Sequence, residues 1–260
     1  MKISFIGGGN MASAILNGIL CSGFTSADNI TVSDFMPEKL SAFAEKGVNI
    51  TSDNMVAAEN ADVILFAVKP DVLRKILPDF AHFENKLFIS IAAGVKIAEL
   101  KKGLGKNANV IRVMPNTPAT VGEGMTVICE SDAEKAHTDF AVSLFETTGK
   151  TLILNEKYID AVTAVSGSGP AYIYMVIEAM ADGGVLCGLP REAAYTLATQ
   201  TVLGAAKTVL ETGEHPGVLK DRVCSPGGTT IEAVYSLEQS DIRGAFIEAV
   251  KKCADKSKSM

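Results

Sequence analysis

Three glycines lie directly behind a short apolar run at the start of the chain. Residues 3–6 read Ile-Ser-Phe-Ile, and residues 7–12 read Gly-Gly-Gly-Asn-Met-Ala, which is a G-x-G-x-x-A pattern. In this pattern the first glycine permits a tight turn, the second lets a pyrophosphate approach the backbone, and the alanine lets helix and strand pack closely. The free N–H groups of a helix that begins there attract phosphate. Dinucleotide binding is therefore favoured over a plain glycine turn.

An acidic residue follows the second predicted strand, residues 30–33. An Asp at this place usually holds the ribose hydroxyls of NAD, whereas an Arg accommodates the 2′-phosphate of NADP. Asp34 favours NAD, but the Ser33 hydroxyl can bond a phosphate and Lys39 can reach one. A different interpretation of Asp34 is a cap for the helix that follows Pro37. The sequence leaves this choice open.

Further candidate residues follow later strands of the same predicted sheet. Residues 67–70 read Ala-Val-Lys-Pro, and residues 92–94 read Ala-Ala-Gly. Ligands of open α/β sheets bind outside the carboxyl ends of the strands, which is where the ribose and nicotinamide belong. The alternative is a tight turn without a ligand. Residues 112–118 end another strand on this edge with two prolines, an Asn and a Thr, which otherwise form an ordinary connection.

Residues 225–230, Ser-Pro-Gly-Gly-Thr-Thr, open a predicted helix in the last third of the chain. Free N–H groups and hydroxyls without an acidic residue favour anion binding, and a small carboxylate is a natural guest. The alternative is simple N-capping by a threonine.

Short apolar runs alternate with segments of helical length as far as about residue 155, which predicts βαβ units, a parallel sheet and right-handed crossovers. The run at residues 63–68 is apolar throughout, as expected of a strand that is covered on both faces. The predicted strands are residues 3–6, 30–33, 63–68, 87–91, 110–114, 125–129 and 151–154, and the predicted helices between the first five are residues 11–21, 37–46, 71–80 and 97–104.

Beyond residue 155 the pattern is helical. A long helix is predicted over residues 161–186 with an interruption at residues 167–170; its uncharged part is too short to span a membrane and is interpreted as a buried helix. Apolar residues lie nearly all round residues 171–181, so this stretch needs cover on several sides, which favours a homodimer. The other predicted helices are residues 191–211, 216–223, 229–237 and 241–256.

Composition excludes several classes of protein. The 260 residues are 47% hydrophobic, which is unlike a disordered chain, and the net charge of −6 without a Lys/Arg cluster argues against nucleic-acid binding. Five scattered cysteines and three scattered histidines indicate neither a disulfide framework nor a metal site. Because no signal peptide is recognised either, we expect a reduced, cytoplasmic protein.

These segments together resemble the pyrroline-5-carboxylate reductase family, which makes L-proline, over essentially the whole chain. The most specific match is residues 216–238, followed by residues 160–172 and the segments that follow the predicted strands. The resemblance implies a Rossmann-type domain with a mostly parallel sheet at residues 1–155, and an all-helical substrate-binding and dimerisation domain at residues 156–260. In that family the helical domains interleave as a homodimer, and five dimers often assemble further.

The resemblance also implies a substrate, a cofactor and site residues. The substrate is (S)-1-pyrroline-5-carboxylate, and the cofactor is NADPH or NADH. The arginine that many NADP-preferring members carry after the second strand is Phe35 here. The Thr230 hydroxyl is the candidate hydrogen-bond partner of the substrate ring nitrogen. The predicted substrate-binding residues are Glu156, Ser225, Gly228, Thr229 and Thr230, and the predicted cofactor-binding residues are Ile6, Gly7, Gly8, Gly9, Asn10, Met11, Ser33, Asp34, Asn54, Ala67, Val68, Lys69, Pro70, Ala92 and Ala93.

Two other functions share parts of this pattern. A related imine or β-hydroxyacid reductase has the same two-domain plan, but β-hydroxyacid dehydrogenases place a catalytic Lys on the long helix. Here no Lys follows the segment at residues 167–169 before Lys207. A non-catalytic dinucleotide sensor has no need of the matched segment at residues 225–230.

Overall fold

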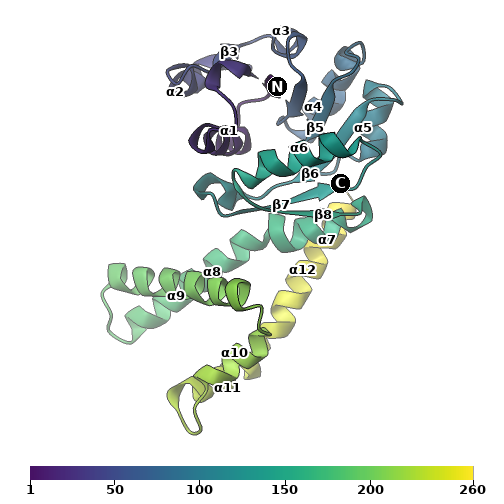
Figure 1. The fold of residues 1–260 in the computed structure, drawn as a ribbon. Helices are drawn as coiled ribbons and strands as arrows, with labels where there is room; N and C mark the ends of the chain where they lie inside the picture. Colours follow the sequence, from purple (N-terminus) through teal and green to yellow (C-terminus); the bar gives the residue numbers. More distant parts are fainter. Residues whose placement is uncertain (260) are drawn as a thin grey trace. The chain divides into compact units, whose positions relative to one another are not determined.

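The computed structural model describes residues 1–259. The described chain forms two compact units: a sheet unit, residues 1–168 with the C-terminal residues from Cys253 onward, and a helical unit, residues 169–252 (Figure 1). Residues 156–168, which the resemblance assigns to the helical domain, therefore pack within the sheet unit. The boundary after residue 155, between a dinucleotide-binding and a substrate-binding and dimerisation domain, stays a prediction.

The sheet unit is built on one mostly parallel sheet. In residues 1–259 eight strands lie in the order β3-β2-β1-β4-β5-β6-β7-β8, and β6 and β7 pair antiparallel. Since β2 and β4 both flank β1, the strand order reverses there, and ligands of such sheets bind at this switch point. The strands are β1 (Ile3–Ile6), β2 (Ile30–Ser33), β3 (Asn49–Thr51), β4 (Val63–Phe66), β5 (Leu87–Ser90), β6 (Asn109–Met114), β7 (Gly124–Cys129) and β8 (Gly149–Leu154).

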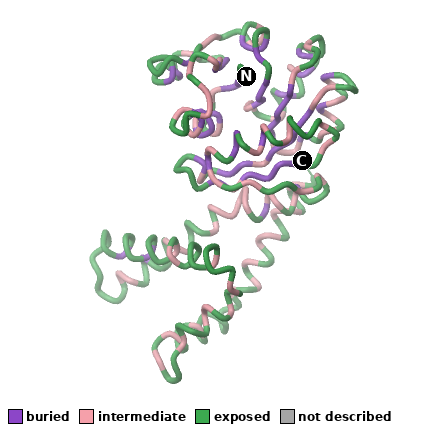
Figure 2. The backbone as a smooth tube through the Cα atoms, viewed as in Figure 1, coloured by how far each residue is buried: buried purple, intermediate pink, exposed green. Residues whose placement is uncertain are grey.

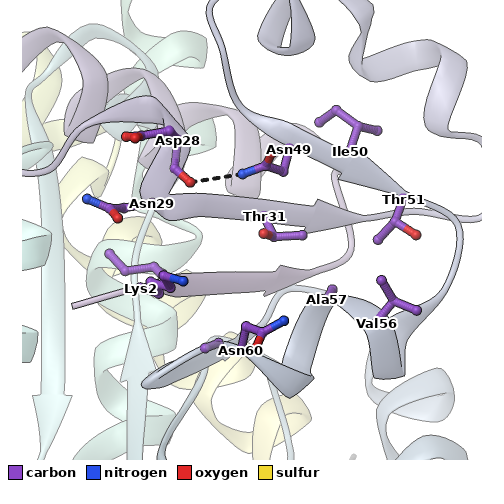
Figure 3. Close-up of a pocket in the computed structure, with 12 residues that line it drawn as sticks. Lys2, Asp28, Asn29, Thr31, Asn49, Ile50, Thr51, Val56, Ala57 and Asn60 are labelled. Atoms are coloured by element: carbon purple, nitrogen blue, oxygen red, sulfur yellow. Dashed lines mark hydrogen bonds between the residues drawn. The ribbon is translucent and has the colours of Figure 1, made fainter.

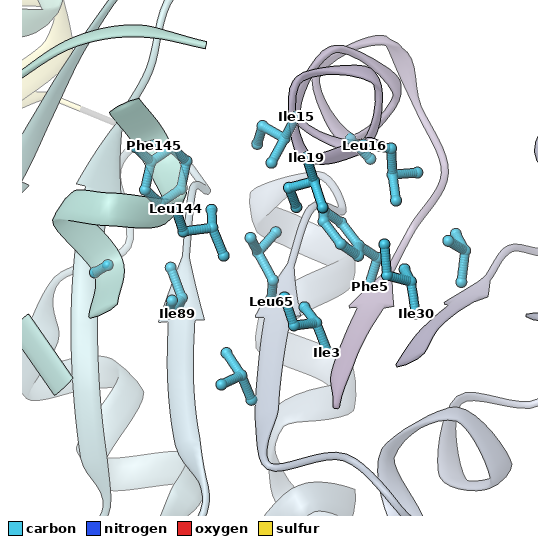
Figure 4. Close-up of a cluster of buried hydrophobic side chains, with 14 of the residues drawn as sticks. Ile3, Phe5, Ile15, Leu16, Ile19, Ile30, Leu65, Ile89, Leu144 and Phe145 are labelled. Atoms are coloured by element: carbon cyan, nitrogen blue, oxygen red, sulfur yellow. The ribbon is translucent and has the colours of Figure 1, made fainter. Parts of the chain in front are cut away.

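Helices cover both faces of the sheet. On one face α1 (Asn10–Ser22) and α6 (Lys135–Glu146) bury apolar side chains against alternate strand residues, with Phe5 and Leu65 among them (Figure 4). On the other face Phe66 packs against side chains that come from α3 (Asn54–Glu59), α4 (Pro70–Ile76) and α5 (Ile97–Leu104). The expectation of a strand that is covered on both faces is thus confirmed for β4. The shorter segments are η1 (Ala27–Asn29), η2 (Pro37–Leu40), α2 (Ser41–Ala44), η3 (Leu77–Phe80), η4 (Thr117–Val121) and η5 (Glu156–Tyr158).

The strands predicted from apolar runs are all present, and their ends differ from the prediction by at most two residues. Ala67 and Val68 of the predicted strand at residues 63–68 lie outside β4, because the chain leaves the sheet there for α4, which begins at Pro70. The predicted helix at residues 37–46 divides into η2 and α2, and the predicted helix at residues 71–80 into α4 and η3. β3, α3 and α6 were missed: β3 is short and carries few apolar residues, and the other two begin with polar residues.

The helical unit contains α8 (Gly169–Leu186), α9 (Arg191–Thr212), α10 (Pro216–Val223), α11 (Thr229–Gln239) and most of α12 (Ile242–Lys258). The long helix is interrupted as predicted, but a few residues earlier than residues 167–170: α7 (Ile159–Val162) runs into a π-helical turn, η6 (Thr163–Gly167), and α8 begins at Gly169. Among the described residues no helix is long and apolar enough to cross a membrane.

A single chain leaves α8 largely uncovered, so its expected burial stays a prediction that depends on the expected homodimer. Ala181 is the one α8 side chain reported as buried, whereas Tyr174 is 60% and Met175 69% exposed. Figure 2 shows most of the helical unit as exposed or half-buried. The reason is that α8 packs on α9 through small residues such as Ala181 and Ala194, which cover one side of it and leave the others open.

Candidate functional site

The glycine turn lies at the switch point of the sheet. Gly7 has a φ of +100°, and a Cβ there would lie 2.8 Å from Val68 Cγ1, so glycine is required for conformation and for space. Its N–H donates to the Ser33 carbonyl at 2.8 Å, and the Ala67 N–H donates to the Ile6 carbonyl at 2.8 Å. The ends of β1, β2 and β4 are thereby held together.

α1 begins with room above its first turn. Gly9 is the N-cap of α1. A Cβ at Gly9 would meet no described atom within 4 Å. Asn10 is exposed and Met11 half-buried beside it. This open glycine cradle fits a pyrophosphate on the N–H groups of α1.

The Asp34 carboxylate ties the end of β2 to the glycine turn. Its Oδ2 accepts from the Gly8 N–H at 2.8 Å, and its Oδ1 accepts from the Met36 N–H at 2.9 Å. The N-cap of η2 is Met36, without a side-chain hydrogen bond to that segment, so the interpretation of Asp34 as the helix cap is wrong. The carboxylate is half-buried at the carboxyl end of β2.

Ser33 and Asn54 meet beneath the same edge of the sheet. The Ser33 hydroxyl donates to Asn54 Oδ1 at 2.7 Å and lies 3.3 Å from the Phe5 carbonyl oxygen, and Ser33 itself is fully buried. The interpretation of Ser33 as a phosphate ligand thus loses support, because its proton is already used below the surface.

The segments after β4 and β5 lie beside each other on this edge, because those two strands pair in parallel. Lys69 is exposed and caps α4 in an extended conformation. Ala92 is buried and Ala93 half-buried, and Gly94 has a φ of +74°. The sheet unit thus brings the predicted cofactor residues to one edge.

Glu156 lies in the sheet unit and is engaged with it. Its Oε1 accepts from the Ile97 N–H at 2.8 Å and from Arg112 Nη1 at 2.9 Å. The Arg112 side chain is 5% exposed. Sequence reasoning noticed the segment that contains Arg112 but gave this residue no role; a buried arginine needs a carboxylate, and nothing in the sequence said which one.

Cys129 lies close to this ion pair. Burial raises the pKa of its thiol to about 11; Arg112 lowers the pKa and Glu156 raises it, and burial has the larger effect. The thiol is therefore neutral at physiological pH and is no candidate nucleophile.

The predicted anion site belongs to the helical unit. Gly227 has a φ of +66°, and Gly228 is the N-cap of α11 without a side-chain cap. A Cβ on Gly228 would lie 2.3 Å from Ser225 Oγ, so a larger residue there would displace the Ser225 hydroxyl. Thr229 and Thr230 are the first residues of α11, so the simple threonine N-cap is wrong, and the hydroxyls and first N–H groups remain available to an anion.

A polar cavity of about 300 Å³ opens elsewhere in the sheet unit (Figure 3). It is lined by Lys2, Asn49 and Asn60, and the Asn49 side-chain amide donates to the Asp28 carbonyl at 2.9 Å. Lys2 precedes β1, and Asn49 begins β3. The cavity thus lies at the amino ends of the strands, away from the glycine turn, and is not the dinucleotide site. No group of three or more potential metal-binding side chains occurs among residues 1–259.

A glycine turn at the switch point of a mostly parallel sheet, with a helix N-terminus open above it, defines a dinucleotide-binding protein of the Rossmann type. Family models agree: "NADP oxidoreductase coenzyme F420-dependent" matches residues 2–94, and "Pyrroline-5-carboxylate reductase dimerisation" matches residues 156–260. The pyrroline-5-carboxylate reductase of Escherichia coli (strain K12) is 47% identical over 263 residues, which span 100% of this chain and 98% of the relative.

Solved structures give the same result. A pyrroline-5-carboxylate reductase from Coxiella burnetii has a TM-score of 0.92 at 38% identity, covering 99% of this chain and 97% of that one. A pyrroline carboxylate reductase from Plasmodium falciparum with NADP bound has a TM-score of 0.91 at 34% identity, covering 100% and 97%. The chain belongs to the pyrroline-5-carboxylate reductase family. The predicted resemblance, two-part fold and NAD(P)H-dependent oxidoreductase class are confirmed.

The raised pKa of Cys129 predicts a pattern of alkylation. At pH 8.5 iodoacetamide should modify Cys21, which is exposed on α1, and leave Cys129 unmodified, as read by peptide mass spectrometry. Because the folded-state pKa lies above the ordinary 9.0, the neutral thiol's contribution to stability is present below about pH 9 and is lost as the pH rises toward 11. In denaturant both thiols should react. Equal alkylation rates of Cys21 and Cys129 in the folded protein would contradict the assignment of Cys129 as a buried, neutral thiol.

Proposed function

We propose that this chain reduces the C=N bond of (S)-1-pyrroline-5-carboxylate with NADPH or NADH and releases L-proline, the last step of proline biosynthesis. The observation that carries the proposal is the start of α11, where a glycine N-cap leaves two threonines and the first N–H groups available. Full-length identity to reductases of this name supports it. In this scheme residues 1–155 bind the dinucleotide, and residues 156–260 bind substrate and form the dimer.

The chemistry asks the protein mainly to hold two molecules in place. The cyclic imine is electrophilic once protonated, so no protein nucleophile is needed, and the bound cofactor supplies the hydride. The substrate carboxylate docks on the N–H groups of Thr229 and Thr230, with the Ser225 hydroxyl beside them, while the Gly228 N–H closes the turn by donating to the Ser225 carbonyl at 3.0 Å. The Thr230 hydroxyl hydrogen-bonds the ring nitrogen and orients the iminium. Positioning of this kind supplies a large part of a rate enhancement.

The cofactor contacts in this proposal follow the sheet edge. The pyrophosphate lies on the first turn of α1, above the open cradle at Gly9. The ribose and nicotinamide lie against the segments that follow β4 and β5. The proposed contacts are Ile6, Gly7, Gly8, Gly9, Asn10, Met11, Asp34, Asn54, Ala67, Val68, Lys69, Pro70, Ala92 and Ala93. Ser33, which is fully buried, supports Asn54 and makes no contact of its own.

The surroundings of Asp34 favour NADH over NADPH. A 2′-phosphate would meet the Asp34 carboxylate, and juxtaposed like charges cost binding energy. The Ser33 hydroxyl, the alternative phosphate ligand, is buried and donates to Asn54. Phe35, 94% exposed, offers no charge where an arginine would. Lys39 on η2 is the remaining cation of this segment and is exposed, so screening by solvent weakens its effect.

The helical unit favours assembly with a second copy. Its buried cluster consists of alanines, while large apolar side chains on α8 stay exposed. An apolar groove of about 550 Å³ lies between α11 and α12, lined by side chains that include Leu237, Phe246 and Ile247. Contiguous apolar surface of this kind marks an interface. We include a homodimer, and a pentamer of dimers as the family resemblance implies, in the proposal; the free cysteines of the described residues support a reducing, cytoplasmic location.

The first prediction concerns activity. The protein should oxidise NADH or NADPH with pyrroline-5-carboxylate and not with hydroxyacids, measured as loss of absorbance at millimolar substrate. Thr230→Ala should lower kcat/KM by about 10- to 100-fold, because the hydrogen bond to the ring nitrogen is lost. Ser236→Ala, an exposed hydroxyl further along α11, is the matched control and should leave kcat/KM unchanged. No turnover with the imine would refute the proposed function, and an unaffected Thr230→Ala would remove this residue from its role.

The second prediction concerns the cofactor. kcat/KM should be at least about tenfold higher for NADH than for NADPH. Asp34→Asn keeps a side-chain oxygen for the Gly8 N–H and removes the charge, so it should reduce that ratio. Glu38→Gln removes an exposed charge on η2 and should leave the ratio unchanged. A ratio that favours NADPH in the parent, or that Asp34→Asn does not move, would contradict Asp34 as the selector.

The third prediction concerns assembly. Light scattering should give a mass of at least twice 27.3 kDa. Met175→Lys, at a position 69% exposed on α8, should shift the protein toward the monomer, because a charge would enter the interface. Val121→Lys, at a position 75% exposed in the sheet unit, should leave the dimer intact. A parent mass of one chain would exclude the dimer.

A further inference from the structure

The loop between β5 and α5 is held at several points. Inside it the Gly94 carbonyl accepts from Arg74 Nη2 at 3.2 Å. At its end the Ile97 N–H donates to Glu156 Oε1 at 2.8 Å. Loops of this kind are ordinarily mobile, so these bonds define where Ala92 and Ala93 stand.

Glu156 satisfies a helix N-terminus from far along the chain. Ile97 is the first residue of α5, and its N-cap, Lys96, makes no side-chain cap bond to that helix. The first N–H groups of a helix lack partners within it, and a carboxylate placed there is favoured by the helix dipole. Glu156 provides that carboxylate across 59 residues.

Arg112 holds Glu156 in this place. Its side chain lies almost wholly inside the sheet unit, and its Nη1 donates to the same Oε1 that accepts from Ile97. Loss of one partner of a buried ion pair strands the other charge and is strongly destabilising. The guanidinium therefore fixes the direction of the Glu156 carboxylate.

We propose that Arg112 and Glu156 are a positioning pair for the cofactor: they fix the start of α5 and, through it, the Ala92–Ala93 surface on which the nicotinamide lies. This inference rests on the proposed function and changes the role of Glu156, which the family resemblance names as a substrate ligand. It also makes Glu156, the first residue of the matched dimerisation region, part of the dinucleotide-binding unit. A loop displaced by about 1 Å is enough to cost hydride transfer a large factor.

The test separates cofactor positioning from substrate binding. Glu156→Gln keeps an oxygen that accepts from the Ile97 N–H and loses the ionic bond to Arg112, whereas Glu156→Ala loses both. We expect the Kd of NADH, titrated by fluorescence without substrate, to rise slightly in the first variant and by about tenfold in the second, with kcat falling in the same order and the KM of the imine within about twofold of the parent. Because this titration needs no substrate, it measures cofactor binding even if the protein does not turn over the imine. Failure of this inference and failure of the proposed function are therefore distinguishable.

The matched control lies on the same helix. Lys101 near the end of α5 pairs with Asp132 at 2.5 Å, so Asp132→Asn breaks an ion pair of α5 that does not hold the loop. We expect it to leave the Kd of NADH unchanged. A raised imine KM with an unchanged NADH Kd in the Glu156 variants would overturn the proposal and make Glu156 a substrate ligand. An equal loss of NADH affinity in Asp132→Asn would show that the Arg112–Glu156 pair contributes only general stability. If Glu156→Ala does not fold, Glu156→Gln with Arg112→Lys carries the same comparison.

Discussion

The site depends on the close approach of the glycine turn to the strand beside it. Gly7 lies so near Val68 that a single added carbon would collide, and this contact brings the ends of β1 and β4 together. Because β2 is tied to the same turn by the Gly7 N–H, three strand ends converge at the point where the strand order reverses. The N-terminus of α1 is open because the glycine turn carries the chain directly from the end of β1 into this helix.

Around that turn the protein uses carboxylates to hold backbone. Asp34 accepts from Gly8 and Met36, and Glu156 accepts from Ile97, so each fixes a loop that borders the proposed dinucleotide site. The two differ in solvation. Asp34 is half-buried and forms no ion pair among residues 1–259, which leaves its charge to act on a ligand. The charge of Glu156 is compensated by the buried Arg112.

Local patterns were enough to predict most of the sheet unit, because buried parallel strands are apolar runs and the glycine motif fixes the turn that follows β1. They were not enough for β3, whose residues Asn49–Thr51 pair at the edge of the sheet with little apolar signal. Long-range pairs were equally out of reach. Arg112 and Glu156 are 44 residues apart, and only the folded sheet shows that Arg112 and the Ile97 N–H of α5 donate to the same Glu156 oxygen. The burial of Ser33, which weakens its interpretation as a phosphate ligand, also depends on the folded sheet and could not be predicted from local sequence.

The helical unit differs from the sheet unit in what stabilises it. Its buried side chains are small, and burial of a methyl group contributes far less than burial of a Phe or Leu side chain. A long helix with apolar residues on several sides then gains most of its burial from whatever covers it, and association stabilises the folded form by mass action. The start of α11, where the proposed substrate carboxylate docks, is part of this unit. In the proposed dimer its geometry therefore depends on assembly, while the geometry of the glycine turn depends on the core of one chain.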